Sequence, residues 1–340
     1  MAQLMKEAVF ITGQSKFEIR EIPLIQLPTD RHVKIKIKWV GICGSDLHSL
    51  ETHFMDELHL GHEWIGEIIE IGSAVKGFAV GNYVTSTVQI SCGVCESCLT
   101  LQGQCANQYS LAVKHGMLRE YAFLPFSALT KIPQPCSSNS TLFEILAVAE
   151  NVYAQVFKDQ CKDKRILIIG AGLLGLSVAL VLKKNGHKPL IIETIPSRIS
   201  RAHQLKLNAC HLAEALLNKD LNDSFDFIVD ASGDHLNSKG GWRYLDHFGR
   251  RGFKAIMLAK YLKSMDIKSD RFFSKQAQLV WIQGCTSQSL ADAVTNWQQE
   301  INDLGKILIT HHFSLGEANE AFATAKKREE AARVIITIGD

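Results

Sequence analysis

The stretch ILIIGAGLLGLSVAL at residues 166–180 constrains the fold of this chain more than any other. A β-branched run ends in a glycine, and two further glycines complete the spacing Gly-x-Gly-x-x-Gly where a helical segment begins. Such glycines allow a tight turn, close approach of a pyrophosphate and close packing of helix on strand. We therefore predict a dinucleotide-binding turn that comprises Gly170, Gly172, Leu173, Leu174 and Gly175.

An acidic residue at the end of the next strand indicates which dinucleotide binds. The run PLIIE ends at Glu193, eighteen residues beyond Gly175. A carboxylate there accepts hydrogen bonds from the adenosine ribose and repels a 2′-phosphate, so NAD is favoured over NADP. Arg198 follows closely and could serve a 2′-phosphate, which leaves NADP as an alternative.

The pattern of strands and helices divides the chain into two parts. Up to about residue 135, short strands alternate with Gly and Pro, which indicates a strand-rich barrel or sandwich. From about residue 140, buried strands alternate with helices, which is typical of a doubly wound parallel sheet. We predict an α/β protein with one domain at 1–150 and 287–340 and a Rossmann domain at 151–286. A single helix is expected over 290–304, LADAVTNWQQEINDL.

Composition excludes several classes of protein. The net charge of +2 gives no nucleic-acid footprint. The apolar run at 173–182 is too short to cross a bilayer, and no signal peptide is recognisable, so we expect a cytoplasmic protein without a membrane partner. The nine cysteines are odd in number, and in a reducing compartment clustered thiols more often hold metal than form disulfides.

Four of these cysteines lie within the sequence CGVCESCLTLQGQC at 92–105. An iron–sulfur cluster or a redox pair is conceivable, but the Cys-Pro ending of bacterial ferredoxins and a helix start are both missing. Four thiolates suit a closed tetrahedral zinc site without an open position for substrate. We predict structural zinc in a lobe at about 90–107, bound by Cys92, Cys95, Cys98 and Cys105.

Other metal-ligating residues are dispersed along the chain. GICGSDLHSL supplies Cys43 and its neighbours, LGHEWIGE supplies His62 and Glu63, and AVAENVYAQ supplies Glu150. Together with the four-cysteine lobe and the glycine turn, in this order, these motifs resemble the zinc-dependent medium-chain alcohol dehydrogenases over nearly the whole chain. Glu150 indicates the polyol (sorbitol) and threonine dehydrogenase branch.

The resemblance implies a GroES-like catalytic domain in which Cys43 and His62 bind a catalytic zinc. A carboxylate completes the ligand set, and either Glu63 or Glu150 could supply it, directly or through water. Asp46 is expected to accept a hydrogen bond from His62 and so to fix the tautomer of its ring.

The resemblance also implies a reaction. Zinc lowers the pKa of a substrate hydroxyl, and hydride passes to NAD. Ser45 receives the released proton and His48 delivers it to solvent. The expected substrate is a secondary alcohol, polyol or sugar-like molecule. A threonine-type 3-hydroxy acid dehydrogenase and a non-catalytic zinc-stabilised NAD-binding protein are the alternatives, and a homodimer or homotetramer is expected.

The sequence departs from the family in ways that leave the substrate unspecified. Six residues separate Cys98 and Cys105, where seven are usual, so we expect a tighter and more weakly occupied lobe. The segment between His48 and His62 is short and lacks a proline before its Gly-His-Glu. Asn151 stands where the family has proline after glutamate.

Overall fold

The computed structural model describes residues 3–52, 55–92, 95–96, 105, 107–160, 162–233, 240–261 and 264–339. The chain forms two compact units, Met1–Ala147 with Cys285–Asp340, and Val148–Gly284. The break near residue 147 falls inside helix α3 (Leu142–Val152), which runs from one unit into the other. The boundaries expected from the sequence, 150/151 and 286/287, lie close to those of the units.

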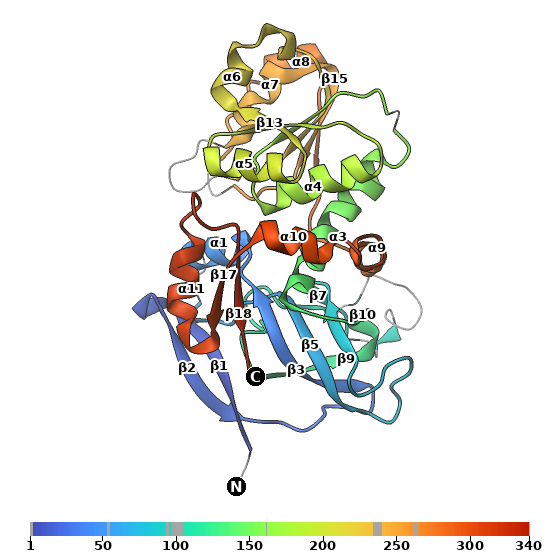
Figure 1. Cartoon of the computed structure of the whole chain (residues 1–340), viewed down its shortest axis with the longest axis vertical. Coiled ribbons are helices and arrows are strands. Elements are labelled where there is room, and N and C mark those ends of the chain that lie inside the picture. The colour runs from blue at the N-terminus through green and yellow to red at the C-terminus, as the bar shows by residue number, and fades with distance from the viewer. Residues whose placement is uncertain are drawn as a thin grey trace. The chain divides into compact units, whose positions relative to one another are not determined.

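The first unit is built mainly of antiparallel strands (Figure 1). Its strands are β1 (Leu4–Ile11), β2 (Lys16–Pro23), β3 (His32–Gly41), β4 (Glu57–Leu58), β5 (Glu63–Ile71), β6 (Tyr83–Ser86), β7 (Gln89–Ile90), β8 (Tyr109–Ser110), β9 (Tyr121–Pro125), β10 (Leu129–Ile132), β17 (Ile309–Ser314) and β18 (Arg333–Thr337). Its helices are η1 (Thr12–Gln14), α1 (Gly44–Thr52), η2 (Phe126–Ala128), η3 (Ser138–Thr141), α9 (Ser287–Trp297), α10 (Ile301–Leu308), η7 (Leu315–Glu317) and α11 (Ala318–Ala325).

The largest sheet of this unit joins distant parts of the chain. Its strand order is β10-β6-β5-β3-β18-β17, and β9 also pairs with β3. β3 alternates buried and half-buried residues, with Val33, Ile35 and Ile37 fully buried, because one face of the strand lies on the core. The C-terminal strand β18 pairs antiparallel with the end of β3, where Ile335 faces Gly41. This pairing brings the start of β18, with Arg333 and Val334, beside Ile42 and the loop after β3.

The second unit contains a parallel sheet of order β13-β12-β11-β14-β15-β16, with helices packed around its strands (Figure 1). This is the strand order of a Rossmann fold, so the predicted fold class is confirmed. Its strands are β11 (Ile166–Ile169), β12 (Leu190–Glu193), β13 (Asn208–His211), β14 (Phe225–Asp230), β15 (Gly249–Met257) and β16 (Gln278–Trp281). Its helices are η4 (Tyr153–Phe157), α4 (Leu173–Lys184), α5 (Pro196–Gln204), α6 (Leu212–Leu217), η5 (Lys219–Leu221), η6 (Gly241–Tyr244), α7 (Leu245–Phe248) and α8 (Ser269–Lys275).

The single helix predicted over 290–304 is wrong. Helix α9 ends at Trp297, and α10 begins at Ile301 after a short turn in which the Glu300 amide donates to the Trp297 carbonyl. Trp297 and Ile301 are both buried, so the turn allows two short helices to bury their apolar faces separately. Among the described residues, no helix is long and apolar enough to cross a membrane.

Candidate metal and dinucleotide sites

The loop between β3 and α1 presents Cys43 and Ser45 and holds them in place through Asp46. The Cys43 amide donates to Asp46 Oδ2 at 2.9 Å, and the Asp46 amide donates to the Cys43 carbonyl at 3.1 Å. Asp46 lies in the first turn of α1, where a carboxylate is favoured by the helix dipole. The Ser45 hydroxyl donates to Cys43 Sγ at 3.2 Å.

His62 lies directly before β5 and completes this group. Its Nδ1 lies 3.1 Å from Asp46 Oδ1, and its Nε2 lies 3.3 Å from the Ser45 hydroxyl. Both His62 and Asp46 are buried. The hydrogen bond to Asp46, which the family resemblance led us to expect, fixes the direction of the His62 ring.

The next residue, Glu63, pairs with a cation from the other end of the chain. Arg333 Nη2 lies against Glu63 Oε2, and Arg333 Nη1 donates to the Ile42 carbonyl at 3.2 Å. Both side chains are fully buried. Glu63 Oε1 is buried without a hydrogen-bond partner among the described residues. Because a buried carboxylate oxygen that accepts no hydrogen bond keeps its electron pairs free, it can bind a cation.

The electrostatics of Cys43 and His62 are coupled. Burial works against ionisation of the Cys43 thiol, yet its pKa falls below the usual value because of the His62 charge and the hydrogen bonds from His62 and Ser45. Burial likewise opposes the His62 cation, but Asp46 and Cys43 together raise the pKa of His62 well above its usual value. The pair therefore favours a thiolate beside a positive charge.

The donor atoms of Cys43, His62 and Glu63 lie within 4.8 Å of one another. One sulfur, one imidazole nitrogen and one carboxylate oxygen form a mixed set that suits catalytic zinc, which keeps a further position open. The buried unpartnered oxygen of Glu63 agrees with this. These residues fit a zinc ion.

A second carboxylate, Glu144 of α3, lies near the same group. It is buried, and Cys285 Sγ donates to its Oε1 at 3.8 Å. Burial raises the pKa of Glu144 to about 7, against the opposing effect of the His62 charge and with further increases from Cys43 and Asp46. Such a carboxyl group lacks a full counter-charge, and a nearby metal cation would supply one.

Glu150 follows six residues later on the same helix and is also buried. Residues six apart on an α-helix differ by about 120° in direction and about 9 Å along the axis. Glu144 and Glu150 therefore do not face the same point. Glu150 is close enough to Tyr153 to add to the rise in the pKa of that phenol, which is caused first by burial.

His48 lies one turn beyond Ser45 on α1 and is half-buried. Residues three apart share a face of a helix, so the two side chains lie on the same side of α1. The Thr52 hydroxyl donates to the His48 carbonyl at 2.9 Å. The proton relay through Ser45 and His48 stays a prediction.

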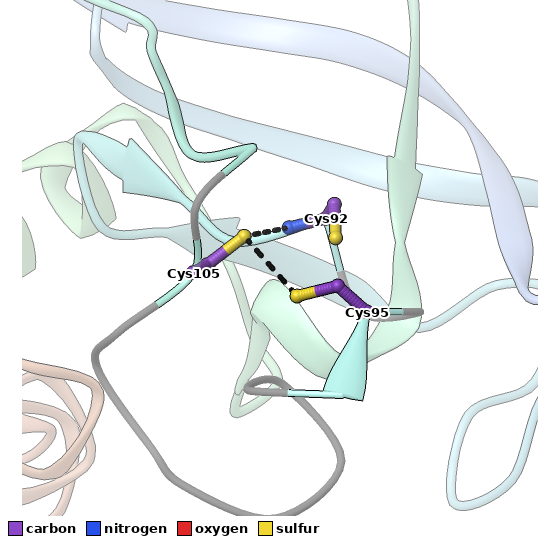
Figure 2. Close-up of side chains that lie close together, drawn as sticks. All are labelled: Cys92, Cys95 and Cys105. Carbon is purple, nitrogen blue, oxygen red and sulfur yellow. Dashed lines mark hydrogen bonds between the residues drawn. The ribbon is translucent and has the colours of Figure 1, made fainter.

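In the cysteine lobe, the sulfur atoms of Cys92, Cys95 and Cys105 lie close together (Figure 2). Cys95 Sγ lies 3.9 Å from Cys105 Sγ, and the Cys92 amide donates to Cys105 Sγ at 3.3 Å. Zinc–sulfur bonds of about 2.3 Å in a tetrahedron place neighbouring sulfurs about 3.8 Å apart. The three residues therefore fit zinc, while Cys98 lies outside the described residues.

The glycine turn has the geometry that a dinucleotide requires. Gly170 has φ +102°, and a Cβ on Gly175 would lie 2.0 Å from the Gly170 carbonyl oxygen. Gly172 precedes α4, which begins with Leu173 and Leu174 and extends its N-terminus toward the turn. A side chain at Gly175 would separate helix from strand, so this glycine is needed for packing.

Glu193 is fixed against this turn by backbone amides. Its Oε2 accepts from the Ala171 amide at 2.8 Å, and its Oε1 accepts from the amides of Thr194 and Ile195 at 2.6 and 3.1 Å. Arg198 Nη1 of α5 lies 3.7 Å from Glu193 Oε2. The structure thus places the predicted Glu193 and Arg198 beside the glycine turn.

Comparisons with known proteins show which proteins this chain is similar to. The family described as "Alcohol dehydrogenase GroES-like domain" matches residues 29–134. A sorbitol dehydrogenase of Halalkalibacterium halodurans is 28% identical, with 96% of each chain covered. An L-threonine 3-dehydrogenase of Paraburkholderia xenovorans is 25% identical over 89% of this chain and 91% of its own. An alcohol dehydrogenase of Escherichia coli complexed with NADH has a TM-score of 0.81 at 22% identity, covering 98% and 99% of the two chains.

Residues 29–134 thus match the GroES-like domain of alcohol dehydrogenases, and nearly the whole chain is similar to sorbitol and threonine dehydrogenases. In this chain, the loop after β3 and the start of β5 bring together residues that the sequence singled out. They are Cys43, Ser45, Asp46, His62 and Glu63.

Two residues at the mixed site were missed by sequence reasoning. Glu144 lies in LFEILAVAE, which contains two glutamates six residues apart, and only the second was singled out. Both glutamates are buried, and it is the pKa of Glu144 that is shifted by the charges of His62 and Cys43. Arg333 gave no signal in the sequence, because its partner Glu63 lies 270 residues earlier.

Proposed function

We propose that this protein is a zinc-dependent oxidoreductase that transfers hydride between NAD and a secondary alcohol or polyol. The observation that carries the proposal is the convergence of the Cys43 sulfur, the His62 imidazole and a carboxylate within one unit. The second unit has a glycine turn with an acidic residue beside it, and this supports a nicotinamide dinucleotide as the partner of the reaction.

The roles of the side chains follow from their contacts. Zinc, when bound, supplies a Lewis acid that polarises the substrate oxygen, and the nicotinamide accepts the hydride. Asp46 holds the His62 ring so that Nε2 is the ligand atom. Ser45 lies within 3.3 Å of both Cys43 Sγ and His62 Nε2, where its hydroxyl can take up the proton that the alcohol releases. His48, on the same face of α1, passes this proton to solvent.

We propose that Glu63 is the carboxylate ligand and that Glu144, rather than Glu150, is the second carboxylate that acts on the metal. Burial raises the pKa of Glu144, and the charges of His62 and Cys43 shift it further, in opposite directions. Glu144 is therefore close enough to these two residues to interact electrostatically with a metal that they bind. Glu63 already has Arg333 as its counter-ion. The other oxygen of Glu63, Oε1, lies with the Cys43 and His62 donors and contributes the third protein donor, while Glu144 adds a further negative charge beside the metal.

The lobe is proposed to hold a second, structural zinc through Cys92, Cys95, Cys98 and Cys105. Half-buried thiolates with a backbone amide directed at one sulfur favour a bound cation. Metal analysis of the purified protein tests both sites, and we expect about two zinc ions per chain.

NAD is the proposed coenzyme, because the Glu193 carboxylate is fixed by three backbone amides and would face a 2′-phosphate as a like charge. Glu193→Ala should raise the KM for NAD about tenfold and lower the KM for NADP, since Arg198 then lacks its acidic neighbour. Initial rates with each coenzyme measure this. An unchanged ratio of kcat/KM for NAD and NADP contradicts the assignment.

The substrate class is tested by following NADH formation with a panel of secondary alcohols, polyols such as sorbitol, and L-threonine. Two relatives bear the names sorbitol dehydrogenase and L-threonine 3-dehydrogenase, so both classes belong in the panel. Turnover of a polyol or secondary alcohol supports the proposal, and turnover of L-threonine alone favours a threonine-type enzyme. Zinc-loaded protein that binds NADH but oxidises none of these contradicts the catalytic role.

We further propose a cytoplasmic homo-oligomer. Metal-binding thiolates require reduced cysteine, which the cytoplasm maintains. The edge strand β16 presents Trp281, which is 59% exposed, as a surface that a second copy can cover. Sedimentation of the purified protein and fractionation of cells that produce it test these two statements.

A further inference from the structure

A pocket of about 250 Å³ lies at one edge of the parallel sheet, in the second unit. It is lined by residues at the beginnings of several strands rather than at their ends. Asp226 lies near the start of β14, Arg250 and Arg251 near the start of β15, and Gln278 is the first residue of β16. The glycine turn follows the carboxyl end of β11, so the pocket lies at the opposite edge of the same sheet.

The pocket is strongly basic. Four of its lining residues are cations, and one is an anion: Lys164, Arg250, Arg251, Lys254 and Asp226. Asp226 is buried and lies between two of the cations, at 3.2 Å from Lys164 Nζ and in direct contact with Arg250. The lining therefore carries a net charge of +3, since four positive charges face one negative charge.

The two remaining cations have no acidic partner among the residues that the structure describes. Within the described part of the chain, no ion pair or hydrogen bond is formed by the side chains of Arg251 and Lys254. Like charges gathered in a concave surface raise the local potential and attract small anions. An arginine that is free of carboxylate can bind a phosphoryl group through two parallel hydrogen bonds.

The backbone at the start of β15 directs Arg250 and Arg251 toward the pocket. The pairing of β14 with β15 is irregular between Phe225 and Phe227, so the residues from Arg250 onward bulge out opposite Asp226. Gly252 in this bulge has φ +80°, a conformation that glycine adopts readily. Bulges of this kind re-aim side chains near sites of binding. Here the bulge turns Arg250 and Arg251 to the pocket.

We propose that this basic pocket binds a small phosphorylated anion at a site separate from the dinucleotide turn. Its volume lies just below the range of about 300–1,000 Å³ that holds drug-sized ligands, so one or two phosphoryl groups on a small molecule fit it. The amides of Gln160 and Gln278 add neutral hydrogen-bond donors beside the cations. The proposal does not depend on the proposed function.

Inorganic pyrophosphate is the probe, and titration calorimetry at constant ionic strength is the measurement. The protein is first saturated with NADH, because pyrophosphate could otherwise bind at the glycine turn. We expect one further site per chain. Sulfate at the same ionic strength should bind more weakly, since it offers a single tetrahedral group.

Variants of one lining residue test the sign of the charge effect. Gln278 is exposed, so replacing it leaves the core intact. Gln278→Glu should weaken pyrophosphate binding about tenfold, and Gln278→Lys should tighten it by about threefold to tenfold. Arg251→Ala should weaken binding to a similar degree.

Lys188→Glu is the matched control, because Lys188 is exposed near the start of β12 on the same edge but does not line the pocket. This variant should leave binding within about twofold of the wild type. Equal weakening by Lys188→Glu and Gln278→Glu, or no heat of binding in the NADH-saturated wild type, would overturn the proposal. A lack of alcohol oxidation would leave it standing.

Discussion

The first unit contains two clusters of metal-ligating side chains that differ in composition and in burial. Cys43, His62 and Glu63 offer sulfur, nitrogen and oxygen, and the last two are buried. Cys92, Cys95 and Cys105 offer sulfur alone and are half-buried. The mixed cluster suits a metal with an open position, and the sulfur cluster suits a closed shell.

The two clusters also differ in how the chain assembles them. The cysteine lobe is local, since Cys92 and Cys105 lie thirteen residues apart. The mixed cluster requires tertiary structure, because Arg333, the partner of Glu63, lies 270 residues away on β18. A change in the lobe should therefore act mainly on stability, whereas a change in the mixed cluster should act on chemistry.

The largest expected contrast is between alanine variants of one cysteine from each cluster. Cys43→Ala should lower kcat at least about a thousandfold, because it removes a donor from the proposed catalytic metal. Cys95→Ala should keep kcat within about threefold for the protein that remains folded, but should lower the Tm by several degrees. Initial rates, zinc content and thermal unfolding measure both.

Binding of NADH provides the control for these variants. The dinucleotide turn lies in the second unit, so both variants should bind NADH as the wild type does. Equal losses of turnover in the two variants, with NADH binding intact, would remove the distinction between a catalytic and a structural cluster.

The two glutamates of α3 sharpen the description of the mixed cluster. Glu144→Gln should lower kcat about a hundredfold and weaken zinc binding about tenfold or more, since a neutral amide adds no negative charge beside the metal. Glu150→Gln should change both by less than about threefold, because it lies on another face of the helix. Chelator competition gives the zinc affinity. A larger effect at Glu150 than at Glu144 would favour Glu150, which together with Glu63 was one of the two carboxylates that the sequence left open.

This pair of residues also marks the limit of what the sequence predicts. Cys43 and His62 lie in short motifs next to strands, and the motif alone identifies them. Glu144 and Glu150 lie in the same helix, and the sequence alone does not tell which of them is affected by the charges of Cys43 and His62; in the structure it is Glu144 whose pKa they shift. Arg333 could not be expected at all, because its position depends on the pairing of β18 with β3.

The same distinction between local sequence patterns and tertiary packing applies to the prediction of the fold. The Rossmann strands were predictable, because each is a short run of buried β-branched residues, as in Ile166–Ile169. The turn between α9 and α10 was missed, because LADAVTNWQQEINDL contains no Gly or Pro. Burial of Trp297 and Ile301 breaks the helix there, and that is a tertiary effect.

The metal-free protein should reveal Glu144 through the pH dependence of its stability. Burial raises the pKa of Glu144 from its usual 4.5 to about 7, so the folded state holds a proton that the unfolded state releases. This contribution to stability is complete below about pH 4.5 and is lost as the pH rises to about 7, by up to about 3 kcal/mol. Urea unfolding of chelator-treated protein across this range measures it.

Glu144→Gln separates this contribution from those of Cys43 and His62, which also titrate. The variant should lose less stability between about pH 5 and about pH 8 than the wild type, because its amide carries no proton to release. Parallel curves for wild type and Glu144→Gln would contradict the raised pKa.

The smallest expected effect concerns His48, and it tests whether the mixed cluster extends along α1 to solvent. His48→Gln should lower kcat for alcohol oxidation by about threefold to tenfold below pH 7, because glutamine cannot carry the proton that Ser45 receives. Above about pH 8, hydroxide and buffer accept this proton, so the kcat values of wild type and His48→Gln should become equal.

His115→Gln is the control, since His115 is exposed beside Tyr109 on β8, the strand next to the cysteine lobe. A small general base such as imidazole in the buffer should restore the rate of His48→Gln and leave that of His115→Gln unchanged. A flat pH profile for the ratio of wild type to His48→Gln would confine the proton path to the residues around Cys43 and His62.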